Sequence, residues 1–218
     1  MAARVFVIHP YAPTMAPMSE AFARLWPAAA KVDLLDESLY ADMDDKGTIT
    51  QELVRRLGLL FDYAREAGAD GIIFTGSTFG PAVDRARQGF TLPVLKPDAA
   101  MAEAAIAAGH RIAVLATAQR ALPVITGGIE GAAAKTGKPA RITGHHVPEA
   151  QAILVAGGRE EHDRRVAAAA ARIADCDVLV LGQISMAPAA ALIGARPGRI
   201  VLTTPDTAVL KMKALLGG

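Results

Sequence analysis

Two turns of similar sequence carry the residues best suited to chemistry in this chain. The segment Gly71 to Pro81 reads GIIFTGSTFGP, and the later segment Val178 to Pro188 reads VLVLGQISMAP. In each, a short apolar run leads into small or polar residues and then into a proline that opens a helix. Such a turn presents unpaired backbone N–H groups at the positive end of a helix dipole, where an anion binds favourably. The pair predicts two half-sites for an anionic ligand, facing one pocket.

The elements that position these turns follow from the apolar pattern. A short apolar run bounded by turn residues is typical of a strand buried on both faces of a parallel sheet. Strand-like and helix-like segments alternate along the sequence, which predicts βαβ units and an α/β fold with parallel sheets. The turns then lie at the carboxyl ends of their strands, where open α/β sheets bind ligands.

The expected elements follow one another regularly. Strands are expected at 3–10, 31–37, 68–74, 92–97, 110–118, 140–147, 177–182 and 198–205. Helices are expected at 19–26 with Ser19 as cap, 50–67 with Thr48 or Thr50 as cap, 81–88, 98–109 with Asp98 as cap, 120–137, 148–174 with a break at 157–158, and 206–215. The acidic segment 38–47 is expected to be a solvated loop.

The pattern restarts near the middle of the chain, which indicates two pseudo-equivalent lobes. The first is expected to comprise residues 1–97 together with 204–218, and the second residues 98–203. The last helix is expected to return and pack on the first lobe. No low-complexity linker separates the two.

Composition excludes several classes of function. A net charge of +1 and an aromatic content of 5% argue against nucleic acid as a partner. A single cysteine excludes an internal disulfide and indicates a reducing compartment. The N-terminus lacks the pattern of a signal peptide, and no stretch has the length of an uninterrupted membrane span. We expect a soluble cytoplasmic protein with no membrane partner.

Five motifs in order give a resemblance to a known family. They are HPYAPT after the first strand, FTGSTFGP, VLATAQRALP, VLVLGQISMAP and LTTPDTAVLKM. Together they resemble the aspartate/glutamate/hydantoin racemase superfamily, to which arylmalonate decarboxylase and maleate isomerase also belong. The resemblance implies two pseudosymmetric Rossmann-like lobes with the active-site cleft between them. It also implies a small carboxylate substrate and chemistry with no cofactor and no metal.

The resemblance also implies two catalytic cysteines, and this chain lacks both. The motifs place the first cysteine position at Gly76 and the second at Gln183. Glycine has no side chain to move a proton, and the glutamine amide does not titrate near neutral pH. The remaining thiol, Cys176, precedes its strand and is expected to be a packing residue. Two-thiol racemisation is therefore chemically impossible here.

The binding residues of the family have counterparts in this chain. Ser77 and Thr78 match its carboxylate-holding polar residues, and Thr117 matches the threonine of the second half. With backbone N–H groups at Gly76 and at the later turn, they are expected to hold a carboxylate or stabilise an oxyanion. In that later turn the candidate binding residues are Gln183, Ile184 and Ser185.

Four further residues are candidates to replace the missing thiols or to bind substrate. His9 is a candidate general base, and the alternative is a loop histidine bonded to backbone. Tyr11 is a candidate donor to a carboxylate, or a cover over the pocket. Lys96 follows a strand and would serve as base or carboxylate partner if desolvated, whereas the alternative is an exposed lysine. Arg120 would clamp a second carboxylate, or remain a surface arginine.

Three interpretations of the function remain open from the sequence. One is a racemase-, isomerase- or decarboxylase-like enzyme that acts beside a carboxylate with non-cysteine acid and base groups. Another is an inactive carboxylate-binding or regulatory protein that kept the pocket. A hydrolase or lyase with a water held by Gln183 and Ser185 is a weaker third possibility. His145 and His146 point to opposite faces of a strand, so no metal site is expected. A homo-oligomer is compatible with the apolar helix surfaces.

Overall fold

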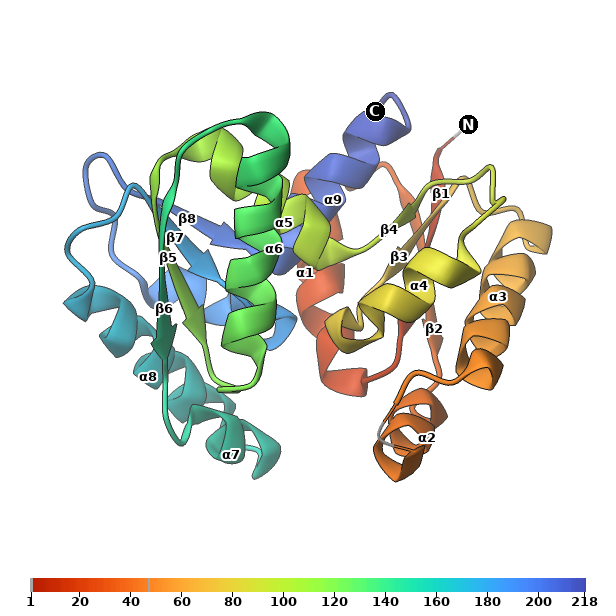
Figure 1. Cartoon of the computed structure of the whole chain (residues 1–218), viewed down its shortest axis with the longest axis horizontal. Coiled ribbons are helices and arrows are strands. Elements are labelled where there is room, and N and C mark those ends of the chain that lie inside the picture. Colours follow the sequence, from red (N-terminus) through yellow and green to blue (C-terminus); the bar gives the residue numbers. More distant parts are fainter. Residues whose placement is uncertain (1, 47) are drawn as a thin grey trace. The chain divides into compact units, whose positions relative to one another are not determined.

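The computed structural model describes residues 2–46 and 48–218, and the strands lie in two parallel sheets (Figure 1). One sheet has the order β2-β1-β3-β4 and the other the order β6-β5-β7-β8. The strands are β1 (Arg4–His9), β2 (Ala30–Leu35), β3 (Gly71–Phe74), β4 (Val94–Leu95), β5 (Arg111–Ala116), β6 (Arg141–His146), β7 (Val178–Leu181) and β8 (Ile200–Thr203). This confirms the predicted α/β fold with two pseudosymmetric, Rossmann-like lobes.

Helices connect the strands. The α-helices are α1 (Met15–Leu25), α2 (Ser38–Lys46), α3 (Gln51–Glu66), α4 (Gly80–Ala86), α5 (Pro97–Ala108), α6 (Ala121–Thr136), α7 (Ala150–Val155), α8 (Arg159–Arg172) and α9 (Thr204–Leu215). The 3₁₀ segments are η1 (Ala12–Thr14), η2 (Ser77–Phe79) and η3 (Ile184–Leu192). The chain forms two compact units, residues 1–97 with 208–218 and residues 98–207.

The core of the first unit covers both faces of its sheet. On one face, side chains from β1 and β3 pack with Leu57 and Phe61 of α3, with Leu39 of α2 and with α4. Phe61 is fully buried and meets the rings of Phe74 and Phe90 edge-on. Helices α1 and α9 lie on the other face (Figure 1). Burial on both faces explains why β3 reads as an uninterrupted apolar run.

The second unit repeats this layering with smaller side chains. On one face of its sheet, α5 and α6 pack with alternate residues of β5 and β7. On the other face, Val166 and Ala170 of α8 pack with Met186 and Ala189 of η3. The two sheets also share their registers, because Thr75 N donates to Ile8 O and Gly182 N donates to Leu115 O. Residue for residue, the turn after β7 therefore corresponds to the turn after β3.

The acidic segment 38–47 corrects one prediction, since residues Ser38–Lys46 form α2 rather than a loop; Gly47 lies outside the described residues. Leu39 is completely buried, and Asp36 caps the helix by accepting from Ser38 N at 3.2 Å. Arg56 of α3 forms ion pairs with Asp36 and Asp42. Asp36 therefore caps the helix and Asp42 pairs with Arg56, which the composition of the segment alone does not indicate.

Two predicted helix caps also differ from the structure. Helix α1 begins at Met15, so Ser19 lies inside it and its hydroxyl donates to the carbonyl of Met15 at 2.9 Å. Helix α5 begins at Pro97, so Asp98 lies in its first turn. Proline is favoured at the first position of a helix because its missing N–H has no partner there anyway. The predicted cap at Thr50 is confirmed, since its hydroxyl accepts from Leu53 N.

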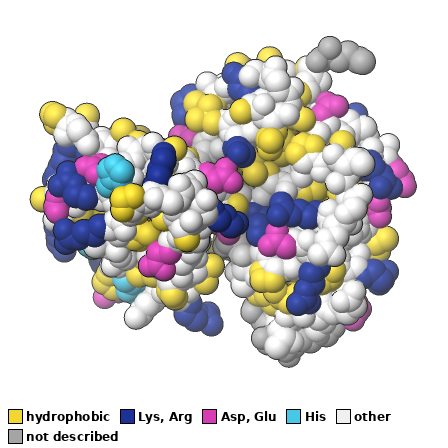
Figure 2. Space-filling model, turned by 45° about the horizontal axis from the view of Figure 1, so that its top comes forward, with side chains coloured by type: hydrophobic (Ala, Val, Ile, Leu, Met, Phe, Trp, Pro, Cys, Tyr) yellow, Lys and Arg dark blue, Asp and Glu magenta, His cyan; other side chains and the backbone are white. Residues whose placement is uncertain are grey.

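The surface carries charges of both signs. On the face shown in Figure 2, Lys and Arg side chains alternate with Asp and Glu side chains, and no field of one sign dominates it. This agrees with the net charge of +1. Within the residues described, no helix is long and apolar enough to cross a membrane.

Candidate functional site

The turn after β3 lies at the switch point of the first sheet. β1 and β3 are neighbours, and the chain leaves β1 towards β2 on one side and β3 towards β4 on the other. Ligands of open α/β sheets bind at such points because the connecting loops diverge there. Gly76 precedes η2, and Phe79 N closes the turn on Gly76 O at 3.1 Å. Ser77 and Thr78 are exposed at this edge of the sheet.

Gly76 occupies a place with no room for a side chain. A β-carbon there would lie 2.7 Å from the ring of Pro10 and 2.8 Å from the rings of Phe74 and Phe79. Both phenylalanines are buried, so neither ring swings aside freely. The backbone φ of Gly76 is −105°, which any residue can adopt, so packing alone excludes a larger residue there. The position that the resemblance assigns to a cysteine is filled by neighbouring side chains.

His9 ends β1 and is fully buried in a polar network. Its Nε2 lies 3.1 Å from Asp33 Oδ1, and its Nδ1 lies 2.7 Å from the Thr14 hydroxyl and 3.2 Å from the Thr75 hydroxyl. A carboxylate only accepts, so Nε2 donates to Asp33 and Nδ1 accepts from a hydroxyl in the neutral ring. Burial lowers the pKa of His9, and Asp33 offsets part of that shift. A neutral His9 therefore fixes Thr14 and Thr75 beside the turn.

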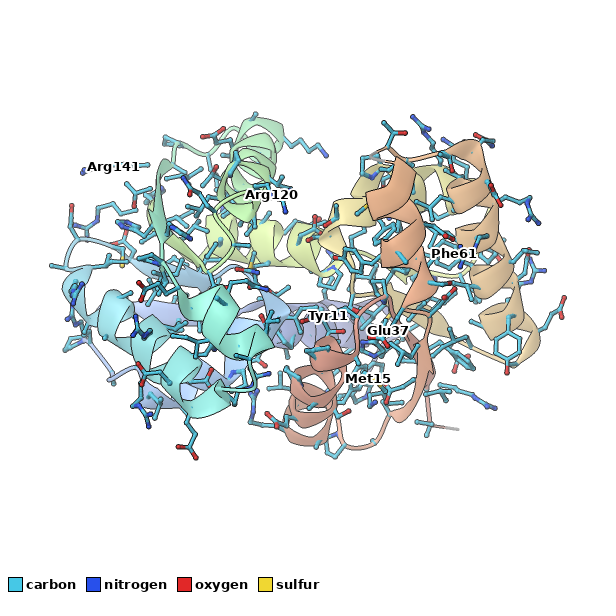
Figure 3. The ribbon with its side chains drawn as sticks, turned by 90° about the horizontal axis from the view of Figure 1, so that it is seen from below. Tyr11, Met15, Glu37, Phe61, Arg120 and Arg141 are labelled. Atoms are coloured by element: carbon cyan, nitrogen blue, oxygen red, sulfur yellow. The ribbon has the colours of Figure 1, made fainter. Side chains whose placement is uncertain are left out.

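Tyr11 lies next to this network in an aromatic group with Tyr40 and Phe79. The rings of Tyr11 and Tyr40 meet edge-on with centroids 6.3 Å apart, and Tyr40 meets Phe79 at 5.1 Å. The Tyr40 hydroxyl lies 3.5 Å from the Thr78 hydroxyl. Figure 3 shows Tyr11 beside Glu37, whose carboxylate accepts from Ala12 N at 3.4 Å. Phenol groups and hydroxyls thus gather at the carboxyl edge of the sheet.

Lys96 follows β4 and is held by an acidic residue of α4. Its ammonium group pairs with Asp84, and its side chain is 17% exposed. A β-carbon at Gly80 would lie 3.9 Å from Lys96 Nζ, so the ammonium lies beside the start of α4. Asp84 also pairs with Arg87 at 2.7 Å. Lys96 is therefore a partly exposed, ion-paired cation near the end of the Gly76 turn.

The turn after β7 repeats this geometry with a long side chain in place of glycine. Gln183 precedes η3, and Met186 N closes the turn on Gln183 O at 3.0 Å, as Phe79 closes on Gly76. Gly182 lies in a tight place, because a β-carbon there would be 2.9 Å from the carbonyl oxygen of Leu115. There is therefore no room for a side chain directly after β7, and Gln183 is the first residue beyond this strand with space for one.

The side chain of Gln183 turns back onto the end of β5. Its Oε1 lies 2.7 Å from Thr117 N, 3.1 Å from Ala118 N and 3.0 Å from the Thr117 hydroxyl. Consecutive backbone N–H groups that converge on one oxygen form a concave site for an anion. The hydroxyl of Thr117 is also 3.0 Å from Gln151 Oε1. An uncharged amide oxygen thus occupies a position that suits a carboxylate oxygen. This position, formed by Thr117 N, Ala118 N and the Thr117 hydroxyl, is called the Thr117 seat below.

The other predicted residues of the second unit lie around this turn. Ile184 and Ser185 are buried, and the carbonyl of Ser185 accepts from Arg159 of α8 at 2.7 Å. Arg120 is exposed at the start of α6 and makes no ion pair with the described residues. Thr117, Gln183 and Ser185 are thus gathered at one end of the sheet, whereas Arg120 is a free surface cation.

The sole cysteine lies away from this end. Cys176 precedes β7 at its amino end, and Gln183 follows the carboxyl end of the same strand. Cys176 is buried in the apolar cluster beneath α8, and burial raises the pKa of its thiol. Among residues 2–43 and 48–218, whose side chains the structure describes, no group of three metal-binding side chains occurs.

Several residues that contact the turns after β3 and β7, or the network of His9, were not identified by the sequence analysis. They are Thr14, Asp33 and Thr75 around His9, Tyr40 beside Thr78, and Gln151 and Arg159 around the Gln183 turn. His146, which the sequence analysis considered only as a metal ligand, also lies there, 3.2 Å from Thr117 O. Thr75 and Thr14 lie within the quoted motifs and could have been chosen as hydroxyl partners. The others come from β2, α2, β6, α7 and α8, and no local pattern connects them with the turns.

The comparisons with known proteins identify a family and support the fold. The sequence model of the family described as Asp/Glu/Hydantoin racemase matches residues 23–212, and the chain belongs to that family. A search of the curated proteins gives no match.

Solved structures of racemases share the fold. Allantoin racemase from Klebsiella pneumoniae gives a TM-score of 0.70 at 16% identity, covering 99% of this chain and 88% of its own. Aspartate racemase from Picrophilus torridus gives 0.67 at 12%, covering 99% and 95%. Glutamate racemase RacE1 from Bacillus anthracis gives 0.66 at 15%, covering 99% and 82%. At these identities the likeness shows the fold.

The packing around Gly76 predicts that even one methyl group there destabilises the protein. We expect Gly76→Ala to lower the free energy of unfolding by about 1–3 kcal/mol, because three rigid neighbours must move. Gly58→Ala is the matched control: Gly58 lies inside α3 with open space around it, and alanine there stabilises by up to about 1 kcal/mol. Urea unfolding of both variants measures the difference. Equal effects at the two positions would contradict the packing argument.

The burial of His9 predicts a loss of stability in acid. When the pKa of a histidine is lower in the folded than in the unfolded chain, the unfolded chain binds a proton at pH values where the folded histidine stays neutral. The stabilising contribution of neutral His9 to the free energy of unfolding is therefore present above its ordinary pKa of 6.5. It is lost as the pH falls below 6.5 towards the lower pKa of His9 in the folded protein. Urea unfolding from about pH 7.5 to about pH 5 should show a shallower loss for His9→Asn than for wild type.

The exposed His110 provides the control for this measurement. His110→Asn should keep the pH dependence of the wild type. If His9→Asn and wild type lost stability in parallel, His9 would not be the buried neutral group that its contacts describe.

Proposed function

We propose that this protein binds a small carboxylate and exchanges a proton at the carbon beside it, with the turn after β3 and the turn after β7 as the candidate binding sites. The reaction class is racemisation, isomerisation or decarboxylation, carried out with no thiol at either turn and with no cofactor. Membership of the racemase family supports the class of reaction. The contact that carries the proposal is the convergence of Thr117 N, Ala118 N and the Thr117 hydroxyl on one oxygen of Gln183.

That contact supports a carboxylate because of what the donors require. Two backbone N–H groups and a hydroxyl at 2.7–3.1 Å from a single oxygen need an acceptor once they are shielded from water. A carboxylate oxygen meets the need better than an amide oxygen, since a charged acceptor roughly doubles the strength of each bond. The same donors would stabilise the oxyanion that forms when a proton leaves the carbon beside a carboxylate.

The proton-transfer groups are proposed from the first unit. Tyr11 and Lys96 are partly exposed and could reach a ligand at the Gly76 turn, whose Ser77 and Thr78 would hold its carboxylate. His9 would act through Thr14 and Thr75, because both of its ring nitrogens are already bonded. Ile184, Ser185 and Arg120 are proposed to border the ligand at the second turn.

An inactive carboxylate-binding protein is the second candidate. One observation favours it: Gly76 is closed by Pro10, Phe74 and Phe79, and Gln183 fills the Thr117 seat, so neither place offers a titrating group. Such a protein would bind carboxylates at the same turns without moving a proton. The two candidates differ only in turnover.

Hydrogen–deuterium exchange at the substrate separates these candidates. The protein is incubated in heavy water with aspartate, glutamate, hydantoins and aryl- or alkylmalonates, and deuterium at the carbon beside the carboxylate is followed by proton NMR. An enzyme incorporates deuterium, and Tyr11→Phe or Lys96→Gln should slow this by about 100-fold or more, the usual contribution of an acid–base group.

Tyr63→Phe is the control for that experiment, because Tyr63 is an exposed residue of α3 away from the turns. It should exchange at the wild-type rate. Absence of exchange with every substrate, together with carboxylate-induced thermal stabilisation, would reject the enzyme and support the binding protein.

Removal of the glutamine side chain tests the Thr117 seat directly. Gln183→Ala leaves the donors of Thr117 and Ala118 without an acceptor, which should cost about 1–3 kcal/mol of stability. Added acetate or malonate should then raise the melting temperature of Gln183→Ala more than that of wild type. Gln119→Ala, at an exposed glutamine of the following turn, should respond as wild type does. An equal response of all three proteins would contradict the proposal for the Thr117 seat.

A further inference from the structure

A groove of about 630 Å³ lies within the second unit, between the edge strand β6 and helix α8. Arg141, Thr143 and His145 form its β6 wall, and Arg165 and Arg172 rise from α8. Its apolar floor is formed by Leu115, Val147, Ala168, Ala169 and Ile173. This volume falls within the range of sites that bind small molecules.

The first unit shows that the fold does not require this groove. By the shared register, Thr143 and His145 of β6 correspond to Val32 and Leu34 of β2. Val32 and Leu34 pack into the first core with α3. The groove therefore exists because polar residues replace two apolar ones at the same places in the sheet.

Smaller side chains beneath these positions enlarge the difference. Phe6 of β1, which pairs with Val32, corresponds to Ala113 of β5, which pairs with Thr143. Helix α3 fills the first core with Leu57 and Phe61, whereas α8 offers Ala168 and Ala169 to the groove. The second unit thus leaves open a volume that the first fills with hydrocarbon.

The charges around the groove favour an anion. Arg172 is exposed, and its side chain forms no ion pair or hydrogen bond with the described residues. Arg141 pairs at 3.5 Å with Asp175, the one carboxylate among the described residues that line the groove, and Asp175 is also bound by Arg111. Arg165 is held in place by Glu149 at 2.7 Å and Glu161 at 2.9 Å. Two guanidinium groups are thus available at the rim of an apolar floor.

Arg141, the first residue of β6, lies at the rim of the groove. Figure 3 shows it at the outer edge of the second sheet, projecting away from the strand. A guanidinium presents a planar fork that matches two oxygens of a phosphate or carboxylate. The apolar floor below would cover the hydrocarbon part of the same molecule.

We propose that the groove between β6 and α8 binds a small organic anion, with its phosphate or carboxylate head on Arg141 and Arg172 and its apolar body on Ala168, Ala169 and Ile173. The head-group end of the groove, at Arg141 and Arg172, lies at the amino end of the strands, whereas Gln183 follows the carboxyl end of β7. The proposal does not rest on the proposed function. His145 and Thr143 supply polar contacts from the strand, their side chains lying 3.0 Å apart. The pairing of Arg165 with Glu149 and Glu161 fixes the remaining wall.

Calorimetric titration of the full chain with phenyl phosphate and with benzoate tests the proposal. Both anions should bind saturably, and inorganic phosphate should bind more weakly because it lacks the apolar body. Tighter binding of phenyl phosphate identifies a phosphate head, and tighter binding of benzoate identifies a carboxylate head. Arg172→Gln and Arg141→Gln should each weaken binding by about 10-fold, the effect of losing one charge-assisted hydrogen bond. Ala169→Phe should abolish binding by filling the floor.

The matched control is Arg164→Gln, which removes the same charge from α8 at an exposed position outside the groove. It should bind phenyl phosphate and benzoate as wild type does. Absence of saturable binding to wild type would overturn the proposal. So would equal losses of phenyl phosphate binding in Arg164→Gln and Arg172→Gln.

Discussion

The constraint on which this structure depends is that a buried parallel strand must end in backbone donors that need an acceptor. Strand β5 is buried from Ile112 to Ala116, so Thr117 N and Ala118 N beyond its carboxyl end need an acceptor. The second unit resolves this with a side chain, since Gln183 caps the end of β5. The first unit resolves it with packing, since rings close over Gly76 and hydroxyls of Thr14 and Thr75 surround His9.

The sequence predicted the fold because the signal for it is local. Apolar runs, prolines and glycine turns repeat in order, and each marks a strand end without knowledge of the rest. The same patterns predicted that Thr117, Gln183 and Ser185 lie at the carboxyl edge of one sheet and that Tyr11 and Ser77 lie at the carboxyl edge of the other. They failed at segment 38–47, because the helix there depends on Asp36, on Arg56 and on burial of Leu39, two of which come from other parts of the chain.

The details of the candidate site needed the three-dimensional structure. Nothing in the sequence indicates that the Gln183 side chain folds back onto Thr117, or that His9 is bonded through both ring nitrogens. These contacts join residues that are far apart in the chain, so they depend on how strands are paired. The groove beside β6 is of the same kind, because it is visible only when β6 is compared with β2 in register.

The position of Gln183 has a consequence for how long a bound acid would stay. An incoming carboxylate at the Thr117 seat must displace an amide that is tethered to the same chain and is therefore present at high local concentration. Such a built-in competitor weakens apparent affinity, yet it also refills the seat as soon as the acid departs. For an acid bound as proposed, the donors would pass from the carboxylate to the amide oxygen without being left unpaired, which favours rapid exchange of the bound acid.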